Sequence, residues 1–181
     1  MSIKLAVPCL LLLAAMAAPA MSAETGQPEA PSGAIMLVRL PEAIQAPGEQ
    51  RIAVLSAEGA QIYECKADAD GKLVWSFREP IATLIENGKT VGRHYAGPNW
   101  ELQDGSAVTA KVTATAPSLT EGAIAYLKLE VTERRGNGAL SAATTVQRFG
   151  TIGGKLDGAC ERAGAFKSVP YSATYVFLKK G

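Results

Sequence analysis

The sequence has few of the features that identify a charge-driven partner. No run of Lys or Arg is longer than two residues, and 18 basic against 17 acidic residues give a formal net charge of +1. A chain so near neutrality has no strong electrostatic attraction to nucleic acid or to an anionic membrane. We therefore expect no nucleic-acid partner.

Signatures of catalysis and metal binding are also missing. The chain has one histidine, no G-x-S-x-G, H-E-x-x-H or C-x-x-C motif, and no EF-hand spacing. We expect neither a metal nor a cofactor. These absences do not decide whether the protein is an enzyme, but they favour the view that it is not.

The first 23 residues have the layout of a secretory signal peptide. Lys4 precedes an apolar stretch over residues 5–18, and small residues offer cleavage sites after Ala20 and Ala23. This stretch is shorter than the roughly 20 residues that span a bilayer; an uncleaved N-terminal anchor is the alternative. We expect an exported protein, periplasmic or extracellular, whose mature chain has no membrane span.

The remaining chain reads as one domain after a short leader. Residues 24–33 are rich in Pro, Gly and Glu, which predicts a flexible segment. Residues 34–181 are enough for a single domain with a substantial core. Removal of residues 1–23 takes away Lys4, so the formal net charge of the mature chain is zero.

Two cysteines, Cys65 and Cys160, remain in the mature chain. Two cysteines in an exported protein most often pair, so we predict one disulfide, with free thiols or a metal site as the alternatives. A bridge between these cysteines would close a loop of 95 positions. In chain-entropy models such a bridge stabilises the fold by up to about 4.7 kcal/mol.

Apolar and polar residues alternate with a period of two through most of the chain. The clearest stretches lie at residues 108–115, 127–132 and 171–177. Leu73, Trp75 and Phe77 share a face, and we expect Trp75 and Phe77 in the core. Such alternation indicates strands with one buried face. No segment after the signal is a convincing amphipathic helix, although a helical turn near residues 158–163 fits the pattern.

Turn signals separate these stretches. Asn87-Gly88 is a strong hairpin signal, and Asp70-Gly71, Asp104-Gly105 and residues 136–138 also favour tight turns. With a first strand at residues 34–40, this gives about nine strands. The expected fold is all-β, an antiparallel β-sandwich or a partly open β-barrel, with one disulfide.

The sequence also resembles a family of small secreted proteins, domain of unknown function 3455. The longest matching stretch, residues 88–101, ends in Gly-Arg-His-Tyr-Ala-Gly-Pro-Asn-Trp-Glu; family members commonly carry Thr where this chain has Asn99. The resemblance implies an exported, β-rich domain and brings no activity. The other matching positions are 59–65, Trp75, 104–106, 147–148, Thr151, 153–154, Cys160 and 171–177.

The stretch from Gly92 to Glu101 is the candidate site. It contains the single histidine and one of the two tryptophans beside a Gly-Pro turn, and we expect Trp100 to be exposed or to line a pocket. Aromatic residues often mark recognition sites, and β-barrels commonly bind ligands at their open ends. The candidate ligand-binding residues are Arg93, His94, Tyr95, Trp100 and Glu101.

Catalytic alternatives use the same region. His94 as a base, Asp104 and Ser106 would form a hydrolase triad, and Glu101 with Asp104 would form the acid pair of a sugar-cleaving enzyme. Asp104-Gly105-Ser106 is first of all a good turn, so no catalytic residue is assigned. Two further alternatives are a calcium site from Asp68, Asp70 and Glu101 and an anion cradle at residues 153–155.

The sequence thus favours an exported binding or structural protein. Its partner would be an unknown small molecule, a glycan or an envelope protein. The alternatives are a hydrolase-type enzyme that uses His94 with an acidic partner, and a surface protein that acts by self-association or attachment.

Overall fold

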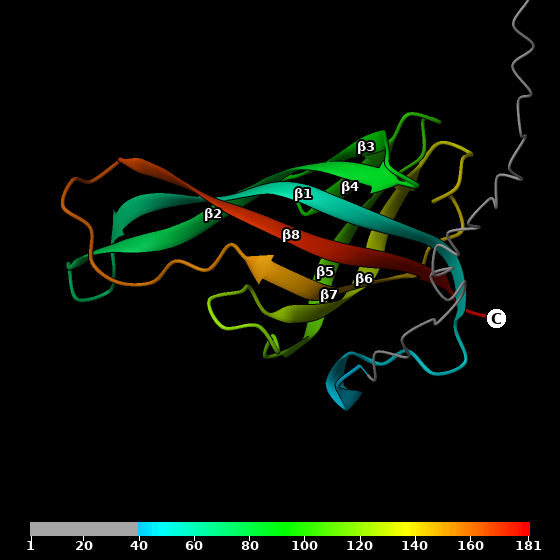
Figure 1. Cartoon of the computed structure of the whole chain (residues 1–181), viewed down its shortest axis with the longest axis horizontal. Helices are drawn as coiled ribbons and strands as arrows, with labels where there is room; N and C mark the ends of the chain where they lie inside the picture. Colours follow the sequence, from blue (N-terminus) through cyan, green and yellow to red (C-terminus); the bar gives the residue numbers. More distant parts are fainter. Residues whose placement is uncertain (1–39) are drawn as a thin grey trace, which may run out of the picture. The chain divides into compact units, whose positions relative to one another are not determined.

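The computed structural model describes residues 40–181, and within them nearly all regular structure is β-strand (Figure 1). One short 3-10 helix, η1 (Glu42–Ile44), precedes the strands. The strands are β1 (Gln50–Ala67), β2 (Leu73–Glu86), β3 (Lys89–Tyr95), β4 (Asn99–Leu102), β5 (Ala107–Ala116), β6 (Tyr126–Arg135), β7 (Thr145–Gly153) and β8 (Phe166–Lys179).

Each strand pairs antiparallel with its neighbours in the sequence, and β8 pairs with β1 to close the ring. The all-β class and the antiparallel pairing are confirmed. The structure has eight strands in one closed barrel, where the sequence left sandwich and partly open barrel as alternatives. The expected signal peptide, leader and first strand at residues 34–40 lie outside the described residues, apart from Leu40, which is not in a strand.

The predicted turns at Asp70-Gly71, Asn87-Gly88 and Asp104-Gly105 join strands, whereas residues 136–138, predicted as a tight turn, begin the longer connection 136–144 between β6 and β7. Asn87 and Gly88 connect β2 to β3 with φ values of 50° and 74°, the left-handed backbone that an Asn-Gly hairpin turn requires. Residues 158–163, where a helical turn was expected, form bends and turns and no helix. The described residues contain no helix long and apolar enough to cross a membrane.

The main core lies inside the ring and is built from the inward residues of every strand. It includes Leu55, Leu84, Trp100, Val108, Leu129, Val146, Tyr175 and Phe177, each at most 1% exposed. A smaller cluster lies outside the ring, where Ile44 packs on Ala116 and Tyr126. The Gln147 side chain fixes this contact because its amide donates to the Ile44 carbonyl at 2.5 Å.

The strands β1, β2 and β8 are longer than the others and run on past the ring (Figure 1). Phe77 lies in this extension and is 55% exposed, so the prediction that it belongs to the core is wrong. Trp75 is half-buried there, with the Lys167 ammonium over its ring. Period-two alternation marks a shared face, but the ring covers that face over only part of the strand.

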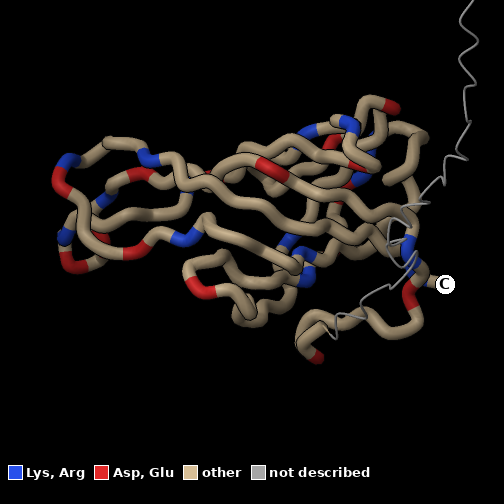
Figure 2. The backbone as a smooth tube through the Cα atoms, in the orientation of Figure 1, with Lys and Arg blue, Asp and Glu red and all other residues tan. Residues whose placement is uncertain are grey.

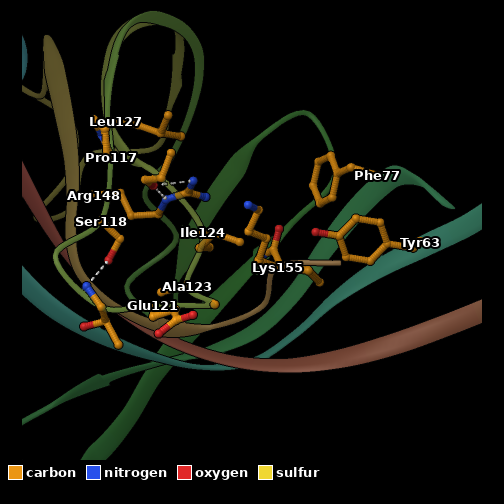
Figure 3. Close-up of a pocket in the computed structure, with 14 residues that line it drawn as sticks. Tyr63, Phe77, Pro117, Ser118, Glu121, Ala123, Ile124, Leu127, Arg148 and Lys155 are labelled. Carbon is orange, nitrogen blue, oxygen red and sulfur yellow. Dashed lines mark hydrogen bonds between the residues drawn. The ribbon is translucent and has the colours of Figure 1, made fainter. Parts of the chain in front are cut away.

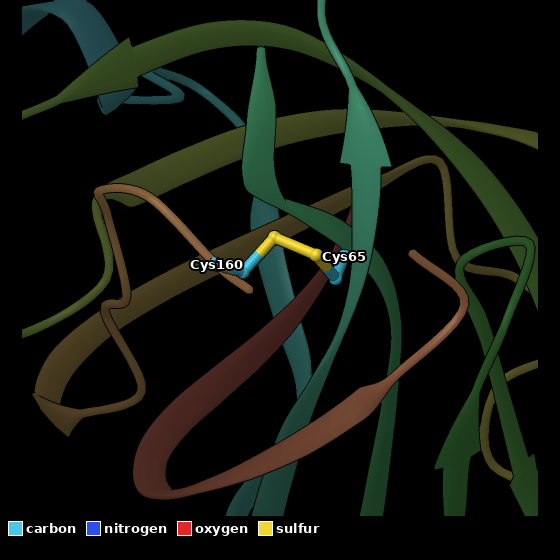
Figure 4. Close-up of a disulfide and its surroundings, with 2 residues drawn as sticks. All are labelled: Cys65 and Cys160. Atoms are coloured by element: carbon cyan, nitrogen blue, oxygen red, sulfur yellow. A yellow bond between two sulfur atoms is a disulfide. The ribbon is translucent and has the colours of Figure 1, made fainter. Parts of the chain in front are cut away.

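The predicted disulfide is present and holds this extension together (Figure 4). Cys65 near the end of β1 bonds to Cys160, 95 positions later, in the segment that precedes β8. The Cys160 amide donates to the Leu73 carbonyl at 3.0 Å, and the Trp75 amide donates to the Gly158 carbonyl at 3.1 Å. The bridge therefore ties the β7–β8 connection to β1 and β2.

Charged residues of both signs are interspersed along the described backbone (Figure 2). In the described structure every ion pair has an exposed basic side chain, and some, such as Lys111 with Glu130, have two exposed partners. Such pairs contribute little to stability because water screens them.

Candidate functional site

The β3–β4 hairpin splits the predicted site between the two faces of the barrel wall. Strand alternation turns His94 and Trp100 inward, where they are 2% and 1% exposed, and leaves Arg93, Tyr95 and Glu101 on the other face. Five candidates that are adjacent in sequence are therefore two separate groups. Of the two options for Trp100, the structure shows a buried ring that lines a pocket.

His94 is held among aromatic rings at the barrel interior. Its ring stacks on Trp100 with centroids 4.5 Å apart and an angle of 10°, and it meets the Tyr175 ring edge-on at 5.0 Å. Its Nδ1 lies 2.8 Å from the Asn99 carbonyl oxygen. Because that oxygen can only accept, Nδ1 carries the proton of the neutral ring and Nε2 has the free lone pair.

Burial keeps His94 uncharged at neutral pH. Loss of hydration lowers its pKa from the ordinary 6.5 to about 4; the Asn99 carbonyl opposes this shift and the Arg148 charge adds to it. No carboxylate contributes to this shift, so the acidic partner that a catalytic base would use is not beside His94 among the described residues.

The outward group is a network centred on Glu101. This carboxylate accepts from Arg93 Nη2 at 3.1 Å and from the Tyr95 hydroxyl at 2.8 Å, and Arg135 lies 3.7 Å away. The Tyr95 hydrogen bond, followed by that of Arg93, lowers the pKa of Glu101. The network is exposed to water, and the Glu101 carboxylate is already paired with Arg93 and Arg135.

Asp104 and Ser106 shape a turn. One Asp104 carboxylate oxygen accepts from both the Ser106 amide (2.8 Å) and its hydroxyl (2.6 Å), and the other accepts from the Ala139 amide. These hydrogen bonds lower the pKa of Asp104, and the bond from the Ser106 hydroxyl has the largest effect. Neither residue is hydrogen-bonded to His94 in the described structure, so the three do not form a connected triad.

The inner cavity is a space of about 280 Å³ at one end of the barrel interior. His94, Trp100 and Tyr175 form an aromatic wall, and Pro80, Pro98 and Leu129 add apolar surface. No Asp or Glu is among the residues that line it. An apolar cavity with a few polar groups is the usual form of a small-molecule site.

An adjoining outer cavity of about 650 Å³ shares Gln61, Phe77, Leu127 and Arg148 with the inner one. Figure 3 shows Tyr63 and Phe77 together on one side of it, across from Pro117 and Leu127. Loop residues 117, 118 and 120–125 form much of the remaining wall, and they include Glu121; Lys155 also lines it. The inner cavity thus adjoins a larger, more open space.

Arg148 lies between the two cavities and is the main site residue that sequence reasoning missed. Its Nε and Nη2 donate to the Ala125 carbonyl at 3.1 and 2.8 Å (Figure 3). It forms no ion pair with a carboxylate among residues 40–181. The available signal was a charged residue two positions after Val146, on the side of β7 that faces inward.

Gln61 was missed for a similar reason. It is 2% exposed and follows Leu55 and Ala57 on the inward face of β1, where apolar side chains are otherwise the rule. A polar residue in an apolar register was the signal that marks it. Tyr171 and Tyr175 were assigned to a strand face but not to a site.

The other predicted alternatives are ordinary loop structure. Asp68 accepts from the amides of Asp70 and Lys72 within its own turn, and no group of three or more metal-binding side chains occurs in the described part of the chain. The Gly154 carbonyl accepts a hydrogen bond from the Tyr63 hydroxyl, and Lys155 forms an ion pair with Asp157.

Comparison with known proteins identifies a family for this chain. The family model described as "Protein of unknown function (DUF3455)" matches residues 46–179, nearly all of the barrel. The chain belongs to this family. No curated protein and no solved structure matches the chain. The matched residues include every strand described above, and the family description names no activity. Any function must therefore be inferred from the residues of the site.

Proposed function

We propose that this protein is an exported binding protein that holds a small molecule in the inner cavity of its barrel. One observation carries the proposal: the buried pair His94 and Trp100, with Tyr175, walls a cavity of about 280 Å³ that adjoins the larger outer cavity. Stacked aromatic rings around an apolar space favour binding of an apolar or aromatic group.

Export is supported by two independent features. The first 23 residues have the signal-peptide pattern, and Cys65 and Cys160 form a disulfide, the kind of bond that persists in oxidising compartments. Periplasm and extracellular space are both oxidising, and the proposal covers either.

The alternative, a hydrolase that uses His94, has less support. The Nδ1 of His94 is oriented by a backbone carbonyl, and a pKa of about 4 makes the ring a weak base near neutral pH. The candidate nucleophile, Ser106, donates to Asp104 within its own turn. The self-association alternative has no specific observation in its favour.

The first test is native mass spectrometry of the protein exported under its own N-terminal sequence and purified without reductant. We expect cleavage after Ala20 or Ala23, an intact disulfide and a bound mass. Leu127 is half-buried and lines both cavities. In the Leu127→Trp variant the added ring should fill the inner cavity and remove the bound mass.

The matched control is Ile152→Trp, which adds the same ring at a side chain that is 61% exposed and lines neither cavity. It should keep the bound mass. A mass that survives Leu127→Trp would place binding elsewhere, and a bare protein in every preparation would count against the binding function.

A further inference from the structure

We infer that the ligand of the inner cavity is an organic carboxylate with an apolar or aromatic body, and that Arg148 receives its carboxylate. This inference rests on the proposed binding function and adds the chemical class of the ligand.

The positive charge of Arg148 has no partner of opposite charge among residues 40–181. Two of its N–H groups donate to one neutral carbonyl, that of Ala125, and no described carboxylate pairs with it. Arg78, which also lines the inner cavity, pairs with Glu79 at 3.2 Å. A guanidinium with free N–H groups matches a carboxylate, which can accept two parallel hydrogen bonds.

Buried donors share the inner cavity with this charge. Among residues 40–181, four buried polar atoms have no hydrogen-bond partner, namely Gln61 Nε2, Trp100 Nε1, Tyr171 Oη and Tyr175 Oη. Each belongs to a residue at most 5% exposed, and three of these residues line the inner cavity. The hydroxyls of Tyr171 and Tyr175 lie close to each other. Tyr171 is also close to Gln61, and Tyr175 is close to Arg148, but none of these contacts has hydrogen-bond geometry.

All four of these atoms can donate a hydrogen bond, and two of them can do nothing else. The amide nitrogen of Gln61 and the indole nitrogen of Trp100 can only donate, and the tyrosine hydroxyls can donate as well. A buried donor without an acceptor costs about 1–3 kcal/mol, so a ligand that supplies acceptors recovers that energy. A carboxylate brings two acceptor oxygens and a negative charge that can pair with Arg148.

The rest of the wall sets the body of the ligand. Pro98, Leu127, Leu129 and the ring of Trp100 are apolar surface. A charged head at Arg148 and an apolar or aromatic body against these groups fit the cavity better than a small inorganic anion, which would leave the apolar surface without contacts.

The test compares matched pairs of probes that differ only in charge: octanoate with octanamide, and benzoate with benzamide. In Trp75→Phe, Trp100 is the one remaining tryptophan, so its fluorescence reports binding at the cavity. Calorimetry on the wild-type chain checks the affinities. We expect each carboxylate to bind at least about tenfold more tightly than its amide, as charge-assisted hydrogen bonds do.

Arg148→Gln should bring the two affinities of each pair to within about threefold, and Arg148→Lys should keep part of the preference. Arg134→Gln is the control, because Arg134 also donates to a backbone carbonyl, that of Ala143, but lines neither cavity. If Arg148→Gln does not fold, Tyr175→Phe and Gln61→Leu remove single donors and should each weaken octanoate binding about three- to tenfold.

The outcomes separate the two proposals. Equal binding of carboxylate and amide would overturn the carboxylate assignment and leave cavity binding intact. The same holds if inorganic phosphate quenches Trp100 and neither carboxylate does, or if no probe binds while native mass spectrometry still finds a bound mass. No probe bound and no bound mass would overturn both.

Discussion

At the scale of single residues, His94 shows how burial sets chemistry. It is the single histidine of the chain, and the sequence allowed it to be a base or a ligand contact. Its position against Trp100 and Tyr175 removes it from water and keeps the ring neutral. The same residue in the outward register would titrate near its ordinary pKa of 6.5 and would not touch the cavity.

This burial predicts a pH-dependent stability. The folded state has a His94 pKa of about 4 and the unfolded state one near 6.5, so between these values the unfolded chain binds more protons. The free energy of unfolding should therefore fall as the pH drops from about 6.5 to 4, by roughly 3 kcal/mol in total. Urea unfolding at a series of pH values measures this change.

The control for this prediction is His94→Phe, which keeps a stacked ring without a titrating group. Its free energy of unfolding should change less than that of the wild type over the same pH range, whatever its absolute value. Equal pH dependence in the two proteins would show that His94 is not the residue responsible.

At the scale of elements, the extension of β1, β2 and β8 depends on a covalent bond more than on a core. Phe77 and Phe166 are more than half exposed there, and the loop before β8 contains little regular structure. Cys65, by contrast, is fully buried, and its bridge to Cys160 brings the loop onto β1 and β2.

We therefore expect the double substitution Cys65→Ala, Cys160→Ala to loosen this region first. The stability should fall by about 2–4 kcal/mol, because the unfolded chain regains the freedom of the long loop. Hydrogen exchange should be faster at the amides of Trp75 and Cys160, which bond to carbonyls across this contact.

The Val131 amide is the internal control, since it donates to the Thr144 carbonyl at the β6–β7 connection. Its exchange should change only with global stability. Uniform acceleration at all three amides would mean that the bridge stabilises the whole barrel and not the extension in particular.

At the scale of the whole molecule, ring closure creates the site. The inner cavity takes Gln61 from β1, His94 from β3, Trp100 from β4 and Arg148 from β7, and closure brings them together. A closed ring also leaves no unpaired strand edges over its length, which protects the sheet from pairing with other chains.

A ligand that binds inside the ring should stabilise the entire fold. With octanoate at 100 times its dissociation constant, the free energy of unfolding should rise by about 2.7 kcal/mol, and the melting temperature should rise with it. At the same octanoate concentration, Arg148→Gln should lose about half of this gain, because a tenfold weaker affinity removes about 1.3 kcal/mol, and Arg134→Gln should keep the gain. Calorimetric melting of the three proteins with and without octanoate gives the comparison; an undiminished gain in Arg148→Gln would contradict the role of Arg148.

The sequence by itself determined the local features of this protein. Alternation over residues 127–132 and 171–177, the Asn87-Gly88 turn and the Cys65–Cys160 bridge depend on neighbouring residues or on a count of cysteines, and all were predictable. The shared face of Tyr171, Ala173, Tyr175 and Phe177, all of which are buried, follows from the same period of two.

Only the tertiary structure decided what these strands enclose. Pairing of β1 with β8 joins residues more than a hundred positions apart, and no local pattern specifies it. That pairing decides that the strands form a ring, that Phe77 lies beyond it and that Arg148 meets the wall of His94 and Trp100. The strand period states which residues share a face, but the side on which a cavity forms depends on which distant strands meet.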